Sequence, residues 1–120
     1  MTRDEIFTKL MELAILINNN KKKSLYEKRQ IVVLNTELKK TKLKYELDVA
    51  NEVDAAGKPK YSNADKRSVE VANRLETDKV YCEKEKLRDA KQEAIEDIEI
   101  EVSNDVYMFR AYEAFANFKE

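Results

Sequence analysis

The side chains that can do chemistry in this chain are one cysteine, many carboxylates and several groups of lysine and arginine; histidine is absent. Zinc ligation and a histidine-based catalytic triad therefore lack their usual groups, and there is no glycine-rich loop to cradle a phosphate. Cys82 precedes Glu83, whose charge opposes a thiolate, so we interpret the cysteine as a packing residue. Carboxylate pairs such as Glu93 and Asp97 are ordinary in a charged helix. The sequence thus predicts no enzymatic activity, no cofactor and no metal site.

Basic residues around a single turn are the first candidates for contact with another molecule. Lysine and arginine side chains beside a tyrosine can contact the phosphates of a nucleic acid. Nearby carboxylates, including Asp54 and Asp65, dilute this positive charge, and the chain as a whole has a net charge of −1. We therefore expect a solvated turn, with nucleic-acid binding as the alternative. The candidate nucleic-acid contacts are Lys58, Lys60, Lys66 and Arg67.

Apolar and aromatic residues near the two ends of the chain form a second candidate surface. In the C-terminal segment, Phe109, Tyr112 and Phe115 recur at helical spacing and share one face. Such a face can dock a partner helix, or it can form core against the N-terminal segment or a second copy of the chain. The candidate interface residues are Phe7, Leu10, Val106, Phe109, Tyr112 and Phe115.

Long helices must position both surfaces. The chain is 39% charged and 42% hydrophobic, and its only glycine and only proline lie two residues apart at Gly57 and Pro59. Because these two residue types are the strongest breakers of regular structure, helices can run uninterrupted on both sides of them. The sequence predicts an all-α protein with one domain over residues 1–120. A thin helical bundle buries little surface per residue, so we expect a homo-oligomer, most simply a dimer.

The first two helix boundaries follow from capping signals. Residues 2–17 are expected to form a short N-terminal helix, because Thr2 to Glu5 has the form of a capping box. The asparagine tract of residues 18–20 disfavours helix and is expected to end it. A second helix is predicted over residues 24–55, since Ser24 begins another capping box.

The turn is predicted at residues 56–62. Gly57 fits the left-handed position that follows a helix, and Pro59 prevents the helix from resuming. A third helix is expected over residues 63–119, with Ser62 or Asn63 as its N-cap. Residues 103–105, which are Ser-Asn-Asp, are the one place where this helix could break.

A coiled-coil seam joins the two long helices in this interpretation. Alternating steps of three and four residues place these side chains on one face of the second helix: Ile31, Leu34, Leu38, Thr41 and Tyr45. In an antiparallel hairpin, residue i faces about residue 118 − i, an estimate from equal helical rise. Leu38 then meets Val80, and the lysines at positions 21–23 face the acidic residues at positions 96, 97 and 99.

Two alternative placements of the N-terminal helix are compatible with this predicted fold. If it continues along the axis of the second helix, its apolar residues lie opposite the aromatic C-terminal segment. If it folds back, it covers residues 31–34 and leaves the aromatic segment without a partner. Leaving several aromatic side chains exposed would cost several kcal/mol, at roughly 1.5–3 kcal/mol for each large side chain. We expect the first arrangement, or a dimer in which the helix covers a second chain.

The turn resembles that of small coiled-coil proteins encoded in bacteriophage and prophage genomes. The residues that carry the resemblance run from Gly57 through Lys58-Pro59-Lys60-Tyr61-Ser62-Asn63 to Arg67, between two long charged helices. Members of this family are mostly of unassigned function, so the resemblance implies an origin and an architecture but no chemistry. It covers about residues 40–90.

These observations lead to a functional expectation. The chain is expected to be a non-enzymatic phage-type interaction or scaffold protein that binds a host or phage protein through helical surfaces. The alternatives are a nucleic-acid-binding accessory protein of phage replication or recombination, and an inhibitor of a host defence protein. The longest apolar run, residues 13–17, is far shorter than the roughly 20 residues that cross a bilayer, so no membrane partner is expected. A single cysteine and no signal peptide fit the cytoplasm of an infected or lysogenic bacterium.

Overall fold

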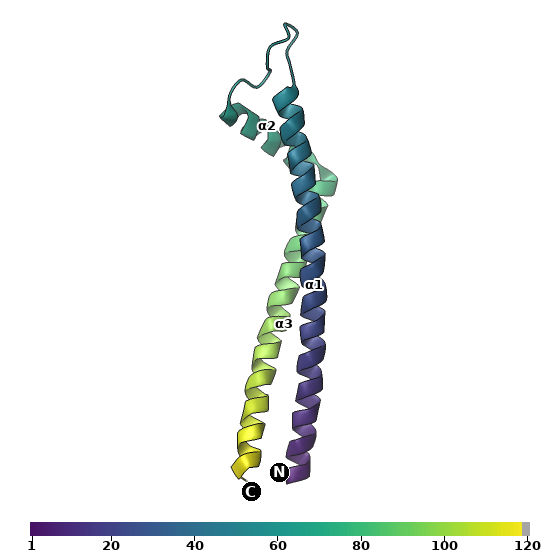
Figure 1. Cartoon of the computed structure of the whole chain (residues 1–120), viewed down its shortest axis with the longest axis vertical. Helices are drawn as coiled ribbons and strands as arrows, with labels where there is room; N and C mark the ends of the chain where they lie inside the picture. Colours follow the sequence, from purple (N-terminus) through teal and green to yellow (C-terminus); the bar gives the residue numbers. More distant parts are fainter. Residues whose placement is uncertain (119–120) are drawn as a thin grey trace. The chain divides into compact units, whose positions relative to one another are not determined.

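The computed structural model describes residues 1–118, and within them the chain is all-helical, as predicted. The helices are α1 (Arg3–Asn51), α2 (Ala64–Thr77) and α3 (Lys79–Phe118) (Figure 1). The chain divides into two compact units. The terminal unit contains Met1–Gln30 and Lys91–Glu120, and the loop unit contains Ile31–Ala90. The predicted end of the last helix at residue 119 lies outside the described residues.

The prediction of a short N-terminal helix over residues 2–17 is wrong, because α1 continues without interruption through residues 18–23. The expected N-terminal cap is present: the Thr2 hydroxyl accepts a hydrogen bond from the Glu5 amide at 3.2 Å. Asparagine costs only about half a kcal/mol per residue in a helix interior, and packing overrides that cost. Asn20 and Ser24 are both buried, so this polar tract continues the packed face of α1. Ser24 is therefore not the cap of a new helix.

The loop after α1 begins earlier than predicted, since the helix ends at Asn51 and not near residue 55. The Asp54 carboxylate accepts hydrogen bonds from the backbone amides of Ala56 and Lys58, which offers the backbone an alternative to helix. Gly57 has the predicted left-handed backbone, with φ of 79°. It lies in a tight turn closed by a bridge between Val53 and Pro59, and not directly after a helix. Its role as a helix terminator was therefore wrongly predicted.

The predicted third helix is two helices, and its break lies at Asp78 and not at residues 103–105. The N-cap of α2 is Asn63, one of the two predicted caps, whose side chain accepts a hydrogen bond from the Lys66 amide. Asp78 has extended backbone at the end of α2, and its carboxylate accepts a hydrogen bond from the Tyr81 amide in the first turn of α3. A single aspartate thus ends one helix and caps the next.

In the terminal unit, the first part of α1 packs along the last part of α3. Figure 1 shows the purple start of α1 beside the yellow end of α3. Lys91 donates a hydrogen bond to Glu27 at 2.9 Å, and Met1 lies beside Phe115. Residues nearer the start of the chain therefore contact residues nearer its end, as in a helical hairpin. The packed positions of α1 recur at alternating steps of four and three: Ile6, Leu10, Leu13, Ile17, Asn20, Ser24 and Glu27. The N-terminal segment therefore lies against the aromatic end, the first of the two predicted arrangements.

In the loop unit, the second part of α1 packs against α2 and the start of α3. At the positions of the predicted seam, Leu34 and Leu38 are buried, and Ile31, Thr41 and Tyr45 are half-buried. Val80 was predicted to meet Leu38 but is 59% exposed, because the helix break at Asp78 turns α3 relative to the expected continuous helix. Tyr81 and Lys84 face inward in its place, and Lys84 pairs with Glu37 at 3.2 Å.

Replacing Asn20 by leucine is expected to stabilise the fold. Asn20 is 5% exposed, and its side-chain nitrogen has no hydrogen-bond partner in the described chain. An unsatisfied buried polar group costs about 1–3 kcal/mol, and leucine removes it while extending the apolar face of α1. Chemical unfolding followed by circular dichroism should give a higher midpoint for Asn20→Leu. The exposed neighbour Asn19→Leu is the matched control and should change stability by only a few tenths of a kcal/mol. A lower midpoint for Asn20→Leu contradicts the assignment.

Candidate functional site

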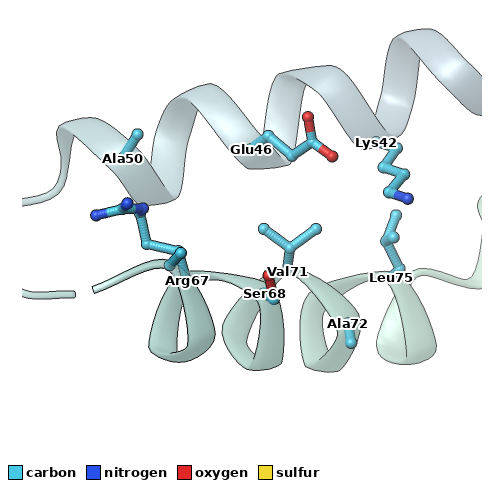
Figure 2. Close-up of a pocket in the computed structure, with 9 residues that line it drawn as sticks. Lys42, Glu46, Ala50, Arg67, Ser68, Val71, Ala72 and Leu75 are labelled. Carbon is cyan, nitrogen blue, oxygen red and sulfur yellow. The ribbon is translucent and has the colours of Figure 1, made fainter. Parts of the chain in front are cut away.

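A groove of about 420 Å³ lies between α1 and α2 in the loop unit (Figure 2). Val71 and Leu75 of α2 point toward α1 across this groove, and Lys42 of α1 extends toward α2. Small residues complete the lining, so the surface is shallow and apolar with charges at its rim. The lining residues are Lys42, Glu46, Ala50, Ala64, Arg67, Ser68, Val71, Ala72 and Leu75.

Apolar and small side chains form most of the groove, with charged side chains beside them. Ser68 is its hydroxyl-bearing residue. No group of three or more metal-ligating side chains is gathered anywhere within residues 1–118. An apolar side chain flanked by charged groups is what this groove can accommodate.

A hydrogen bond between Tyr45 and Asp78 fixes the end of α2 against α1. The tyrosine hydroxyl donates to the Asp78 carboxylate at 2.6 Å, and that carboxylate also accepts from the Tyr81 amide. The hydrogen bond from Tyr45, followed by that from the Tyr81 amide, lowers the pKa of Asp78. The same bond to Asp78 is the main cause of a raised pKa for Tyr45. This pair joins α1 to the junction between α2 and α3.

Arg74 makes a second link between α1 and α2. Its guanidinium donates hydrogen bonds to Glu70 on the same helix and to Glu52, which directly follows α1. The bond to Glu70, followed by that to Glu52, raises the pKa of Arg74. The bond from Arg74 lowers the pKa of Glu52. Tyr45, Asp78, Glu52 and Arg74 therefore hold the groove walls together, which assigns a structural role to these ionisable groups.

The predicted nucleic-acid contacts lie in or near the loop, and two of the four are engaged within the chain. Lys60 pairs with Glu52 at 3.8 Å and lies 5.7 Å from the centre of the Tyr61 ring. Arg67 donates a hydrogen bond to the Tyr61 carbonyl and lines the groove. Lys58 and Lys66 are exposed. Nucleic-acid contact at this turn remains a prediction.

The candidate interface residues divide into two sets in the terminal unit. Leu10, Val106, Phe109 and Tyr112 are half-buried between α1 and α3. Phe7 and Phe115 are 65% and 47% exposed. Phe115 borders a shallow apolar hollow of about 250 Å³ at the ends of the two helices. The first set therefore packs within the chain, and the second set presents apolar surface outward.

A second apolar stripe runs along α1 in the terminal unit. Its members each follow a packed residue by one position: Phe7 after Ile6, Met11 after Leu10, Ala14 after Leu13, and Leu25 after Ser24. One residue is a rotation of about 100° around a helix, so this stripe lies to the side of the packed face. Met11 is 56% exposed and Leu25 is 49% exposed. We call Phe7, Met11, Ala14 and Leu25 the lateral stripe.

Sequence reasoning found some of these features and missed others. It identified Phe7 as an interface residue but did not separate it from Leu10, because the two lie on neighbouring faces that only the packed structure distinguishes. The link from Tyr45 to Asp78 was missed, although the signal was present. Asp78 follows Thr77 and precedes a helical pattern, which is an N-cap signature.

Comparison with known proteins gives no match to a family model, a curated protein or a solved structure. Within residues 1–118, none of the helices has the length and apolar character needed to span a bilayer.

Replacing Tyr45 by phenylalanine is expected to reduce the pH dependence of stability. The lowered pKa of Asp78 means that its contribution is present above about pH 4, the usual value of the unfolded carboxyl, and is lost as pH falls through the folded value. The raised pKa of Tyr45 means that its contribution is present below about pH 10 and is lost above it. Thermal unfolding between pH 2 and 11 measures both effects.

Tyr45→Phe should lower the melting temperature at pH 7 and flatten the profile at both extremes. Tyr26→Phe, at an exposed position, is the matched control and should retain the profile of the original chain. Identical profiles for Tyr45→Phe and the original chain would show that the bond to Asp78 contributes no stability.

Proposed function

We propose that this chain is a non-enzymatic helical interaction protein that assembles with other protein chains through exposed helical faces. The observation that carries the proposal is the lateral stripe of α1, which presents large apolar side chains beside an already packed face. A helix with two adjacent apolar faces is typical of bundles in which each helix has two neighbours. In the terminal unit, α1 has one such neighbour, which is α3.

The proposal includes antiparallel coiled-coil pairing of α1 with α3. Two observations in the terminal unit support it. The packed positions of both helices recur at alternating steps of three and four, which is the spacing of a coiled-coil seam. Glu27 pairs with Lys91, the residue that the antiparallel register assigns to it.

Exposed apolar area gives the energetic reason for association. Fully burying a large apolar side chain contributes about 1.5–3 kcal/mol relative to leaving it in water. Phe7, Met11 and Leu25 on one helix therefore offer several kcal/mol to a partner that covers them. Part of that gain is offset by the entropy lost on association. Contact through the lateral stripe needs neither a catalytic group nor a cofactor.

The proposal includes a phage origin and a host or phage protein partner. Both rest on the resemblance of the turn, residues 57–67, to that of small coiled-coil proteins of phage and prophage genomes. Inhibition of a host defence protein would be one form of such an interaction. The nucleic-acid alternative has weaker support, because Lys60 and Arg67 are engaged with Glu52 and the Tyr61 carbonyl.

Replacing two residues of the lateral stripe by serine tests the proposed function. Phe7→Ser with Met11→Ser removes exposed apolar surface and leaves the packed neighbours Ile6 and Leu10 in place. We expect helical content to be retained and the mass from light scattering to fall to that of one chain. Val69→Ser is the matched control, since Val69 is 62% exposed but lies on α2 in the loop unit. A double variant that retains the mass of an assembled original chain would contradict the role of the stripe.

A further inference from the structure

The packed face of the terminal unit contains polar side chains at one level. Ser24 of α1 and Val102 of α3 line the same hollow, of about 580 Å³, so these two residues lie at matching positions along the two helices. Asn20 precedes Ser24 by about one helical turn, and Asp105 follows Val102 by about one turn. Because contacts between the two helices follow the order of a hairpin, both steps lead toward the chain ends. Asn20 and Asp105 therefore lie at the same level on facing helices, which we call the polar level.

Asn20 and Asp105 each carry a buried polar atom without a hydrogen-bond partner. Within residues 1–118, these atoms are the Asn20 side-chain nitrogen and the Asp105 Oδ2. Asn20 is 5% exposed, and the neighbouring Ser24 is buried as well. A polar atom that is buried without a partner loses its hydrogen bonds to water and gains none in their place. The two atoms therefore oppose packing of the helices at the polar level, and separation of the helices returns both to water.

Closer to the chain ends, the packed face of the terminal unit is apolar. Ile6 is fully buried, and Leu10, Leu13, Phe109 and Tyr112 are half-buried. We call these five residues the end cluster. They form a small core between the polar level and the ends of the chain.

The polar level separates the end cluster from the rest of the terminal unit. On its other side, Ile95 is buried, and Lys91 pairs with Glu27. The part of α1 that crosses the polar level, residues 18–20, consists of three asparagines, which are poor helix formers. Contact between the helices and the local stability of α1 are therefore reduced at the same level.

We propose that the end cluster opens as one cooperative segment, comprising residues 3–17 and 106–118, while residues 24–102 stay folded. Segments that open on their own are joined to the rest of a protein by few favourable contacts, which is the situation at the polar level. In the open form, Phe109 and Tyr112 lose their cover and become an apolar surface that the closed form hides. This opening goes beyond the proposed function, since it needs no partner on the lateral stripe.

Native-state hydrogen exchange of the original chain, followed by NMR, tests the proposal. After correction for intrinsic exchange, the amides of residues 10–17 and 106–115 should share one rate and one dependence on denaturant concentration. That rate should be about tenfold or more above the rate at Leu34 and Leu38. Rates that rise gradually toward the chain ends would indicate simple fraying and would overturn the proposal. Rates equal to those at Leu34 and Leu38 would also overturn it, because the chain would then open only as a whole.

A paired substitution links the opening to the polar level. Asn20→Leu with Asp105→Leu removes both unpartnered atoms, so exchange in the end cluster should slow by about thirtyfold or more. Asn19→Leu with Asn104→Leu is the matched control, because both positions are exposed. It measures the gain in helix propensity alone, which should slow exchange by at most about fivefold. Equal slowing in the two variants would contradict the proposal. If the paired variant folds poorly, the exchange pattern of the original chain decides by itself.

Discussion

The packed face of α1 is the constraint on which the rest of the structure depends. It recurs at alternating steps of three and four residues within each unit, from Ile6 to Glu27 in the terminal unit and from Ile31 to Tyr45 in the loop unit. Asn20 and Ser24 are buried on this face, where apolar residues would pack better. The helix therefore continues through this segment because of the packed residues on either side of it. A polar position in such a face reduces stability but restricts the alignment of the helices.

The loop unit contains the turn that follows α1. Asp54 and Gly57 form the turn itself, and Asn63 starts the helix that follows. The short helix α2 is then joined to α1 by Arg74 and by the bond from Tyr45 to Asp78. The ionisable groups whose pKa values are shifted most clearly belong to these links. Their shifts therefore report which hydrogen bonds join α2 to α1.

The sequence was sufficient for the fold class, the place of the turn and the packed positions from Ile31 to Tyr45, because these depend on local breakers and periodicity. It failed at residues 18–23, where poor local helix formers are overridden by packing that only the partner helix provides. It also failed at Asp78, since one capping residue among many acids is a weak signal. The lateral stripe could not be separated from the packed face until the inward residues were known. Phe7 and Leu10 were therefore placed in one set.

If another chain completes the terminal unit, the absolute mass of the original protein must exceed that of one chain. Light scattering after size exclusion should be measured over a range of protein concentrations, at low and high salt. We expect a mass of twice that of one chain, which persists at high salt at high protein concentration because apolar contacts supply most of the affinity. A mass of one chain at every concentration and salt would contradict it, since Phe7, Met11 and Leu25 would then remain exposed to water without a partner.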